Sequence, residues 1–225
     1  MLESTGVFDI LFPELALGRG LAQKAEFHSY DVLEHSLHAV CYAEKALRLA
    51  ALLHDVGKPF CKITYGTFHG HAEHGAVISA NMLRRFKADK RTIADVMFLV
   101  RWHMFDVKLE ETEQSIRQFI VENRSNLSAL LKLKQADYSA GHDDVSVCPT
   151  VAKWLDIYKK MKEDGTPLSV KDLKISSKTL MDVGFSRERI GAELKTLFNY
   201  AVINPVANNA EFLREKAERD FKLLR

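Results

Sequence analysis

The stretch Leu52-Leu53-His54-Asp55-Val56-Gly57-Lys58-Pro59 decides how the rest of the sequence is interpreted. On a helix, neighbouring residues point about 100° apart, so His54 and Asp55 do not share one face. At the last turn of a helix, however, both side chains can converge on an ion beyond the helix end. We therefore predict a helix that ends here, with Gly57 as its C-terminal cap and Pro59 preventing its continuation.

A neutral imidazole beside a carboxylate suits a divalent metal ion, and Mn, Fe, Co, Ni, Zn and Mg all remain open. Two such ions ~3.5–4 Å apart can hold both the attacking and the leaving oxygen of a phosphoryl displacement. Lys58 could offset negative charge that builds up on a phosphate. The candidate ligands of a first site are His35, His54, Asp55 and Asp137, and those that could complete a second site, bridged by Asp55, are His71 and His103.

A lone histidine before an aspartate is more often an ordinary surface or core residue than a metal ligand. Four further candidate ligands shift this balance towards metal binding. Of the remaining histidines, His28 is the best candidate for a substrate contact or a proton donor, and His38 could reach the same cleft as His35. The other three are better explained as surface residues or as neighbours of the ligands.

The spacing of His35 and His54 restricts the fold. One continuous helix would place them about 28 Å apart at 1.5 Å per residue. Two ligands of one ion need Cα atoms within roughly 12 Å of each other. The metal site therefore requires a reversal near residues 41–46, where no glycine or proline marks one. Either ordinary residues make this turn, or a short loop is missing from the chain.

The chain as a whole is predicted to be all-α, because helical periodicity recurs and hairpin-turn signals are absent. Gly and Pro mark loops around 57–75 and 141–149. The expected helices are 39–55, 79–86, 92–102, 112–122, 127–140, 151–162, 188–200 and 210–224, with Asn204-Pro205 between the last two.

Composition narrows the class of protein further. With 47% hydrophobic and 28% charged residues, the 225-residue chain is long and apolar enough for a sizeable core. The formal net charge of +2 demands no nucleic-acid or membrane partner. No apolar run approaches the ~20 residues of a membrane span, and three cysteines without C-x-x-C spacing fit reduced thiols. We expect a cytoplasmic protein with no membrane partner, and the oligomeric state stays open.

At the residues quoted above, the sequence resembles the HD superfamily of metal-dependent phosphohydrolases, whose pattern is His, His-Asp, Asp. More narrowly, it resembles the HD-containing C-terminal half of bacterial CCA-adding enzymes, the tRNA nucleotidyltransferases. This resemblance implies an HD helical bundle at 1–148 and a small helical extension at 149–225, similar to the tRNA-binding part of those enzymes. The stretches that carry it are 12–15, 30–35, 49–59, 68–76, 115–120 and 167–211.

The resemblance implies hydrolysis of nucleotide phosphoesters, either 2′,3′-cyclic phosphodiesters or phosphomonoesters, by hydroxide generated at one or two divalent ions. Asp55 and Lys58 would be the catalytic residues, and His71 and His103 resemble ligands of dinuclear HD hydrolases. A purely structural metal is less favoured, because structural zinc sites are usually Cys-rich.

A non-catalytic alternative is a tRNA-binding HD half of a truncated or split nucleotidyltransferase. The sequence has no Gly-Ser followed by an Asp-x-Asp pair, which the polymerase head requires, and family-like sequence begins abruptly at the N-terminus. Basic clusters at 84–91 and 153–162 could follow RNA phosphates. Charge pattern alone makes a solvated helix face about twice as frequent an explanation for such clusters.

Overall fold

The computed structural model describes residues 6–23, 29–142 and 144–224, and every regular element within these ranges is a helix. The predicted all-α class is therefore confirmed. None of the helices described combines the length and hydrophobicity that crossing a membrane requires.

The chain divides into two compact units. One comprises residues 1–109 and 125–151, and the other comprises residues 110–124 and 152–225. The short segment 110–124 therefore groups with the C-terminal part of the chain. The functional assignment of 1–148 and 149–225 stays a prediction.

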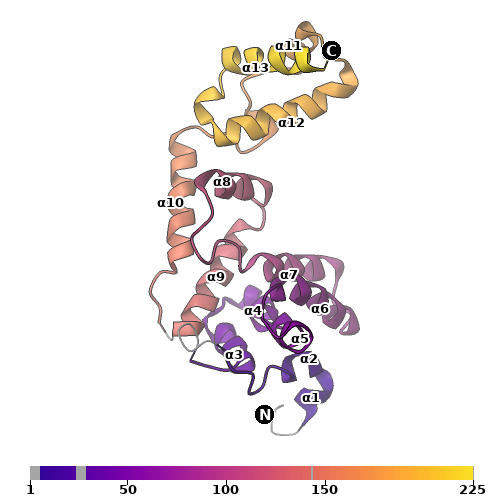
Figure 1. Ribbon diagram of the computed structural model, residues 1–225, viewed down its shortest axis with the longest axis vertical. Coiled ribbons are helices and arrows are strands. Elements are labelled where there is room, and N and C mark those ends of the chain that lie inside the picture. Colours follow the sequence, from indigo (N-terminus) through magenta and orange to yellow (C-terminus); the bar gives the residue numbers. More distant parts are fainter. Residues whose placement is uncertain (1–5, 24–28, 143, 225) are drawn as a thin grey trace. The chain divides into compact units, whose positions relative to one another are not determined.

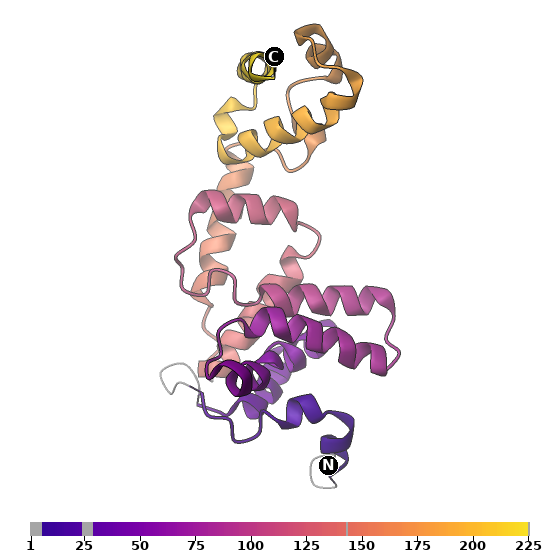
Figure 2. The same cartoon turned by 45° about the vertical axis from the view of Figure 1, so that its right-hand side comes forward.

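The first unit is a bundle of helices (Figure 1). Most of the hydrophobic side chains buried in it are aliphatic. Its elements are α1 (Val7–Leu11), α2 (Pro13–Ala16), α3 (Val32–Tyr42), η2 (Lys45–Leu47), α4 (Arg48–Leu53), α5 (Gly57–Tyr65), α6 (His71–Arg85), α7 (Lys90–Trp102) and α9 (Leu127–His142). Helix α6 packs against α5 and α7, and α3 packs against α4 and α9. Both views show α6 and α7 side by side (Figures 1 and 2).

Aspartate side chains start two helices of this unit. Asp31 precedes α3 and accepts a hydrogen bond from the backbone N–H of Glu34 at 2.8 Å. Asp89 precedes α7 and accepts from the N–H groups of Arg91 and Thr92 at 2.9 and 3.0 Å. These caps satisfy N–H groups that have no partner inside the helix.

The chain reverses between α3 and α4 without a glycine or a proline. Helix α3 ends at Tyr42, and Ala43 and Glu44 are extended, with ψ angles of 140° and 149°. Ala43 and Leu47 are buried, so their hydrophobic burial offsets the helical hydrogen bonds that the turn gives up. The expected helix over 39–55 is therefore wrong, and ordinary residues make the turn that the metal site requires.

Gly57 and Pro59 begin a helix rather than ending one. Pro59 lies in the first turn of α5, where its missing N–H has no helical partner to lose. The expected C-cap and helix stop are therefore wrong, and so is a loop throughout 57–75. Gly57 is required for another reason, because a Cβ there would lie 2.1 Å from the backbone oxygen of His71. This close approach brings the start of α5 against the start of α6.

The second unit is also helical, with its own core. Its elements are α8 (Glu113–Glu122), most of α10 (Pro149–Glu163), η3 (Val170–Asp172), α11 (Ser177–Val183), α12 (Arg187–Ile203), η4 (Pro205–Ala207) and α13 (Ala210–Leu223). Leu180, Leu197 and Leu213 are completely buried between α11, α12 and α13. Gly184 ends α11 with φ at 119°, and a Cβ there would collide with the ring of Phe221.

Candidate metal centre

Two histidines and two aspartates meet inside the first unit. His35 lies in α3, His54 and Asp55 directly follow α4, and Asp137 lies in α9. The Nε2 atom of His54 is 3.2 Å from His35 Nε2 and 3.2 Å from Asp55 Oδ2. Asp137 Oδ1 is 3.3 Å from His54 Nε2 and 2.8 Å from His35 Nε2. The residues predicted for a first site therefore do lie together.

A second group of three residues shares Asp55 with the first. His71 begins α6, and His103 follows the end of α7. Their Nε2 atoms are 3.3 Å apart, and they lie 3.2 and 3.6 Å from Asp55 Oδ1. Oδ1 of Asp55 thus faces one pair of histidines and Oδ2 faces the other. This is the bridging position that the sequence predicts for Asp55.

Backbone carbonyls fix the orientation of three of the four rings. In each ring, Nδ1 hydrogen-bonds to the carbonyl oxygen three residues earlier, at 2.7 Å for His54, 2.9 Å for His71 and 2.7 Å for His103. A carbonyl oxygen can only accept, so Nδ1 carries the proton. In the neutral ring, Nε2 then presents its lone pair to the centre of the cluster.

The atoms that converge on the second group are therefore all acceptors. His71 and His103 each direct a lone pair inward, and neither can donate to the other when neutral. Oδ1 of Asp55 is buried and, among the described residues, has no hydrogen-bond partner. A divalent cation would satisfy all three atoms at once, and histidine held by a carbonyl is the usual arrangement of a metal ligand. The residues present thus fit a metal ion.

Burial and charge act in opposite directions on this cluster. Burial lowers the pKa of His54, but the charges of Asp55 and Asp137 outweigh it and raise that pKa to about 10. Burial would raise the pKa of Asp55, but His54 and Lys58 hold it well below its usual value. The pKa of His103 falls to about 4, mainly through burial. The carboxylates are thus ionised and strongly favour positive charge between them.

Lys58 is a positive side chain in direct contact with Asp55. Its Nζ donates to Asp55 Oδ2 at 2.6 Å and to Gln23 Oε1 at 2.6 Å. Lys58 lies three residues after Asp55, a spacing that brings side chains together on helical backbone, so its position beside Asp55 was predictable from the sequence. The contact with Gln23 was not, because this residue precedes α3 and carries no recognisable motif.

A second lysine hydrogen-bonds to the backbone of the segment that carries His103. Lys134 in α9 is 3% exposed, and its Nζ donates to the backbone oxygens of His103 and Phe105 at 2.7 and 2.6 Å. Burial lowers the pKa of Lys134 to about 8, although Asp137 opposes this shift. The lysine thereby links the helix that carries Asp137 to the chain segment that carries His103. Sequence reasoning did not find it.

The centre is closed on most sides. His35, His54, Asp55 and His103 are at most 1% exposed. The Asp137 carboxylate is 20% exposed, and the His71 and Lys58 side chains are each 8% exposed. Solvent therefore reaches the cluster past Asp137, His71 and Lys58.

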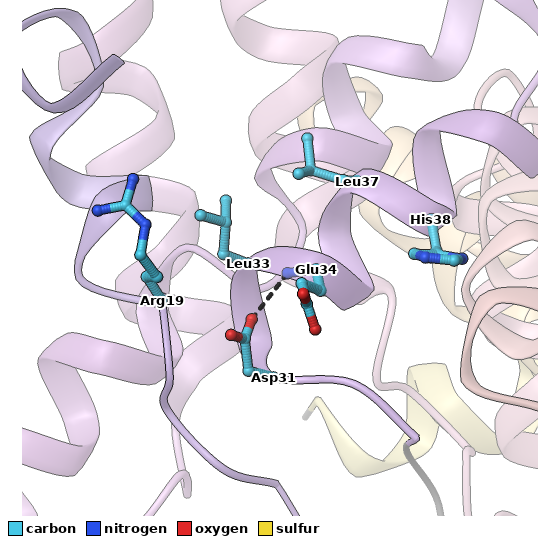
Figure 3. Close-up of a pocket in the computed structure, with 6 residues that line it drawn as sticks. All are labelled: Arg19, Asp31, Leu33, Glu34, Leu37 and His38. Atoms are coloured by element: carbon cyan, nitrogen blue, oxygen red, sulfur yellow. Dashed lines mark hydrogen bonds between the residues drawn. The ribbon is translucent and has the colours of Figure 1, made fainter. Parts of the chain in front are cut away.

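The other histidines lie outside both ligand groups or outside the described residues. His38 stacks on Tyr30, with ring centroids 3.9 Å apart, and lines an open hollow of about 280 Å³ (Figure 3). In that hollow Asp31 caps α3, and the lining includes none of the candidate ligands. The substrate contact suggested for His28 falls outside the described residues and stays a prediction.

Residues 27–138 match the HD domain. All six candidate ligands lie within this match, and HD domains define a superfamily of metal-dependent phosphohydrolases. The chain therefore carries an HD domain, and over the HD-containing region it is homologous to CCA-adding and A-adding tRNA nucleotidyltransferases.

Three relatives illustrate this homology. The A-adding tRNA nucleotidyltransferase of Deinococcus radiodurans is 37% identical over 151 residues, which cover 62% of this chain and 34% of the relative. The CC-adding tRNA nucleotidyltransferase of Thermus thermophilus is 36% identical over 149 residues, covering 61% and 34%. The Multifunctional CCA protein of Pasteurella multocida is 32% identical over 98 residues, covering 38% and 23%. The chain thus spans about a third of the length of the first two relatives.

Proposed function

We propose that this chain is a metal-dependent phosphohydrolase acting on nucleotide phosphoesters, either 2′,3′-cyclic phosphodiesters or phosphomonoesters. The observation that carries the proposal is the pair of buried His/Asp groups that share the two oxygens of Asp55. When bound there, one or two divalent ions would lower the pKa of an attacking water and reduce the charge on the phosphate.

In this proposal the ligands fall into two sets. His35 and His54 face Oδ2 of Asp55, with Asp137 in contact with both histidines, and His71 and His103 face Oδ1. Three of the imidazoles hold a proton on Nδ1, so in their neutral form the lone pair on Nε2 faces the centre without any rotation of the ring. His54, whose pKa is about 10, would release its second proton when a metal ion binds. The two carboxylates supply fewer negative charges than two divalent ions supply positive ones. The loaded centre would therefore attract a phosphate anion.

Lys58 would stabilise negative charge on the phosphate. Its ammonium group contacts Asp55 and lies on the side that solvent reaches, so a substrate phosphate can approach it. A preorganised cation in a mostly buried site typically contributes about 10²–10³-fold to the rate. Gln23 holds the same ammonium group through its side-chain oxygen and would keep it in place.

The direct test combines metal analysis with a hydrolysis panel. We expect the purified chain to bind one or two equivalents of divalent metal and to hydrolyse a 2′,3′-cyclic nucleotide or an aryl phosphate. His54→Ala and Asp55→Ala should lose bound metal and hydrolysis together. His69→Ala is the matched control, because His69 is exposed and lies outside both ligand groups. Unchanged metal content in both ligand variants would refute the proposal.

A second candidate is a tRNA-binding half of a nucleotidyltransferase without catalytic activity of its own. The homology supports it, because two of the relatives are tRNA nucleotidyltransferases whose length this chain covers only in part. This candidate predicts tRNA binding that weakens steeply with salt and no hydrolysis with any of the candidate metals. Hydrolysis that disappears in Asp55→Ala would reject it.

A further inference from the structure

We propose that Lys62 and Phe68 form a second phosphate-binding subsite beside the metal centre. Given the phosphohydrolase function proposed above, the substrate would then be a nucleotide that carries a neighbouring phosphate, as the end of an RNA chain does. A free mononucleotide with a single phosphate would bind less tightly.

The first step in the argument is the position of two ammonium groups around one ring. Lys58 Nζ is 5.9 Å from the ring centroid of Phe68, and Lys62 Nζ is 5.8 Å from it. Both distances fall within the range of a cation–π interaction. Lys58 also contacts Asp55, so the ring connects the metal centre to a second, outer cation.

The second step is that the outer cation has no negative partner. Lys62 is exposed and donates to the backbone oxygen of Gly66 at 3.0 Å, and within the described part of the chain no carboxylate pairs with it. Some of the other exposed lysines do have such partners. Lys132 pairs with Glu44, and Lys160 pairs with Asp156. Lys62 is therefore available for an external anion.

The third step is that the backbone holds this subsite at a fixed place relative to the ligands. The carbonyl oxygen of Phe68 accepts the Nδ1–H of His71, so the residue that carries the ring also orients a candidate ligand. The Gly66 carbonyl, at the end of α5, holds the Lys62 ammonium group. The backbone of Phe68 thus holds the ring at a fixed distance from a candidate ligand.

Because each ammonium group lies within 6 Å of the same ring centroid, the two are at most about 12 Å apart, and neighbouring phosphates of one strand could each contact one of them. In this arrangement Lys58 faces the phosphate that is cleaved, and Lys62 faces the phosphate one nucleotide earlier. Phe68 keeps the two ammonium groups at comparable distances from a common point. Its remaining exposed surface is available to a base or a ribose.

The test compares substrates that differ only in the second phosphate. We expect the KM for a dinucleotide ending in a 2′,3′-cyclic phosphate to be about tenfold lower than for the corresponding cyclic mononucleotide, a typical factor for one hydrogen bond to a charged group. Lys62→Gln should remove this difference by raising only the KM for the dinucleotide, with kcat unchanged. Phe68→Leu should reduce it.

A binding measurement makes the test independent of turnover. Calorimetry should show that the wild type binds adenosine 3′,5′-bisphosphate more tightly than adenosine 3′-phosphate. Lys62→Gln should bind the two nucleotides with equal affinity. Matched controls are Lys90→Gln and Phe86→Leu. Lys90 is the first residue of α7, and His103 follows the last. Phe86 follows the last residue of α6, and His71 is the first. Each control residue is therefore separated from a candidate ligand by about 20 Å of helix.

The outcomes separate the two proposals. Hydrolysis with equal KM values for the two substrates would overturn the second subsite and leave the phosphohydrolase function standing. A preference that persists in Lys62→Gln would also overturn it. Absence of hydrolysis and of bound metal would overturn the function, while the bisphosphate measurement would still decide whether Lys62 binds a phosphate.

Discussion

At the scale of single residues, the side chains that hold the candidate ligands in place matter as much to the metal centre as the ligands themselves. A buried ammonium group is costly unless its N–H groups find acceptors. Lys134 meets this requirement through two backbone oxygens, one of which belongs to His103. Its position is therefore coupled to the position of the His103 backbone.

Replacement of Lys134 by methionine tests this coupling. Methionine keeps the length and the apolar stem but removes the donors, so the segment that carries His103 loses its anchor. We expect the variant to lose about half of its bound metal, from the group that contains His103, and hydrolysis to fall about 10–100-fold. Elemental analysis and the hydrolysis panel measure both effects.

Lys132→Met is the matched control for that variant. Lys132 lies two residues earlier in the same helix, is exposed and pairs with Glu44, so its loss should change neither measurement. Full metal content and activity in the Lys134 variant would show that the two backbone hydrogen bonds do not position His103.

The sequence was informative about the ligands and uninformative about their support. His54, Asp55 and Lys58 are neighbours along the chain, so their proximity follows from local geometry. Lys134 and Gln23 act only through contacts made by the folded chain, and nothing in their own surroundings in the sequence distinguishes them from surface residues. The ligand role of the six His and Asp side chains stays a prediction until metal is measured.

At the scale of helices, the crossing of α5 and α6 depends on a missing side chain. Gly57→Ala would place a Cβ 2.1 Å from the backbone oxygen of His71. The two helices would have to separate, and overpacking of this kind typically costs about 1–3 kcal/mol. We expect a lower free energy of unfolding in urea and weaker metal binding, because His71 moves with α6.

Gly191→Ala is the comparison for this change. Gly191 lies inside α12 with no atom within 4 Å of the position of a Cβ, so alanine should be neutral or should stabilise the helix by up to about 1 kcal/mol. If Gly57→Ala behaved in the same way as Gly191→Ala, the close crossing would be wrong.

The packing of α12 on α13 predicts a dependence of stability on pH. Glu193 in α12 faces Asp220 and Lys216 of α13; burial and then Asp220 raise its pKa to about 7, although Lys216 opposes this. Between pH 4.5 and about 7 the folded state holds a proton that the unfolded state has released. The free energy of unfolding should therefore fall as pH rises through this window.

Glu193→Gln checks this prediction. The amide carries no charge at any of these pH values. The free energy of unfolding, measured by urea unfolding from pH 4.5 to 7.5, should therefore fall less with rising pH in the variant than in the wild type. If the free energy of unfolding changed with pH equally in the variant and the wild type, the prediction would be contradicted.

The sequence predicted helix positions correctly where a long stretch showed helical periodicity. The predictions were wrong where a tertiary contact determines the backbone conformation. The expected helices at 92–102 and 127–140 correspond to α7 and α9. The errors lie at 39–55, where burial of Ala43 and Leu47 stabilises a turn that no breaker residue marks, and at 57–75. In the latter, Gly57 and Pro59 were interpreted as helix breakers, although proline is well suited to a first turn.

At the scale of the whole molecule, the candidate centre lies entirely in the first of the two units. Metal that binds only the folded state stabilises it by mass action. The two tryptophans can report on the units separately, because Trp102 lies in α7 of the first unit and Trp154 in α10 of the second.

Chelation should therefore lower the melting temperature of one unit. In Trp154→Phe, we expect EDTA to lower the melting temperature reported by Trp102 fluorescence. In Trp102→Phe, EDTA should leave the melting temperature reported by Trp154 fluorescence unchanged. Re-addition of Mn²⁺ should restore the first transition. A Trp102 transition that is insensitive to chelation in a protein shown to hold metal would contradict the prediction.

The hydrogen bonds from Nδ1 of His54, His71 and His103 all reach a carbonyl only three residues back in the chain. The direction of each ring is thus settled within a single turn of backbone, before distant parts of the chain meet. Assembly of the centre then reduces to bringing a few helix ends to the right separation. Substitutions deep in the core should consequently change how far apart the rings stand, while the way each ring points survives.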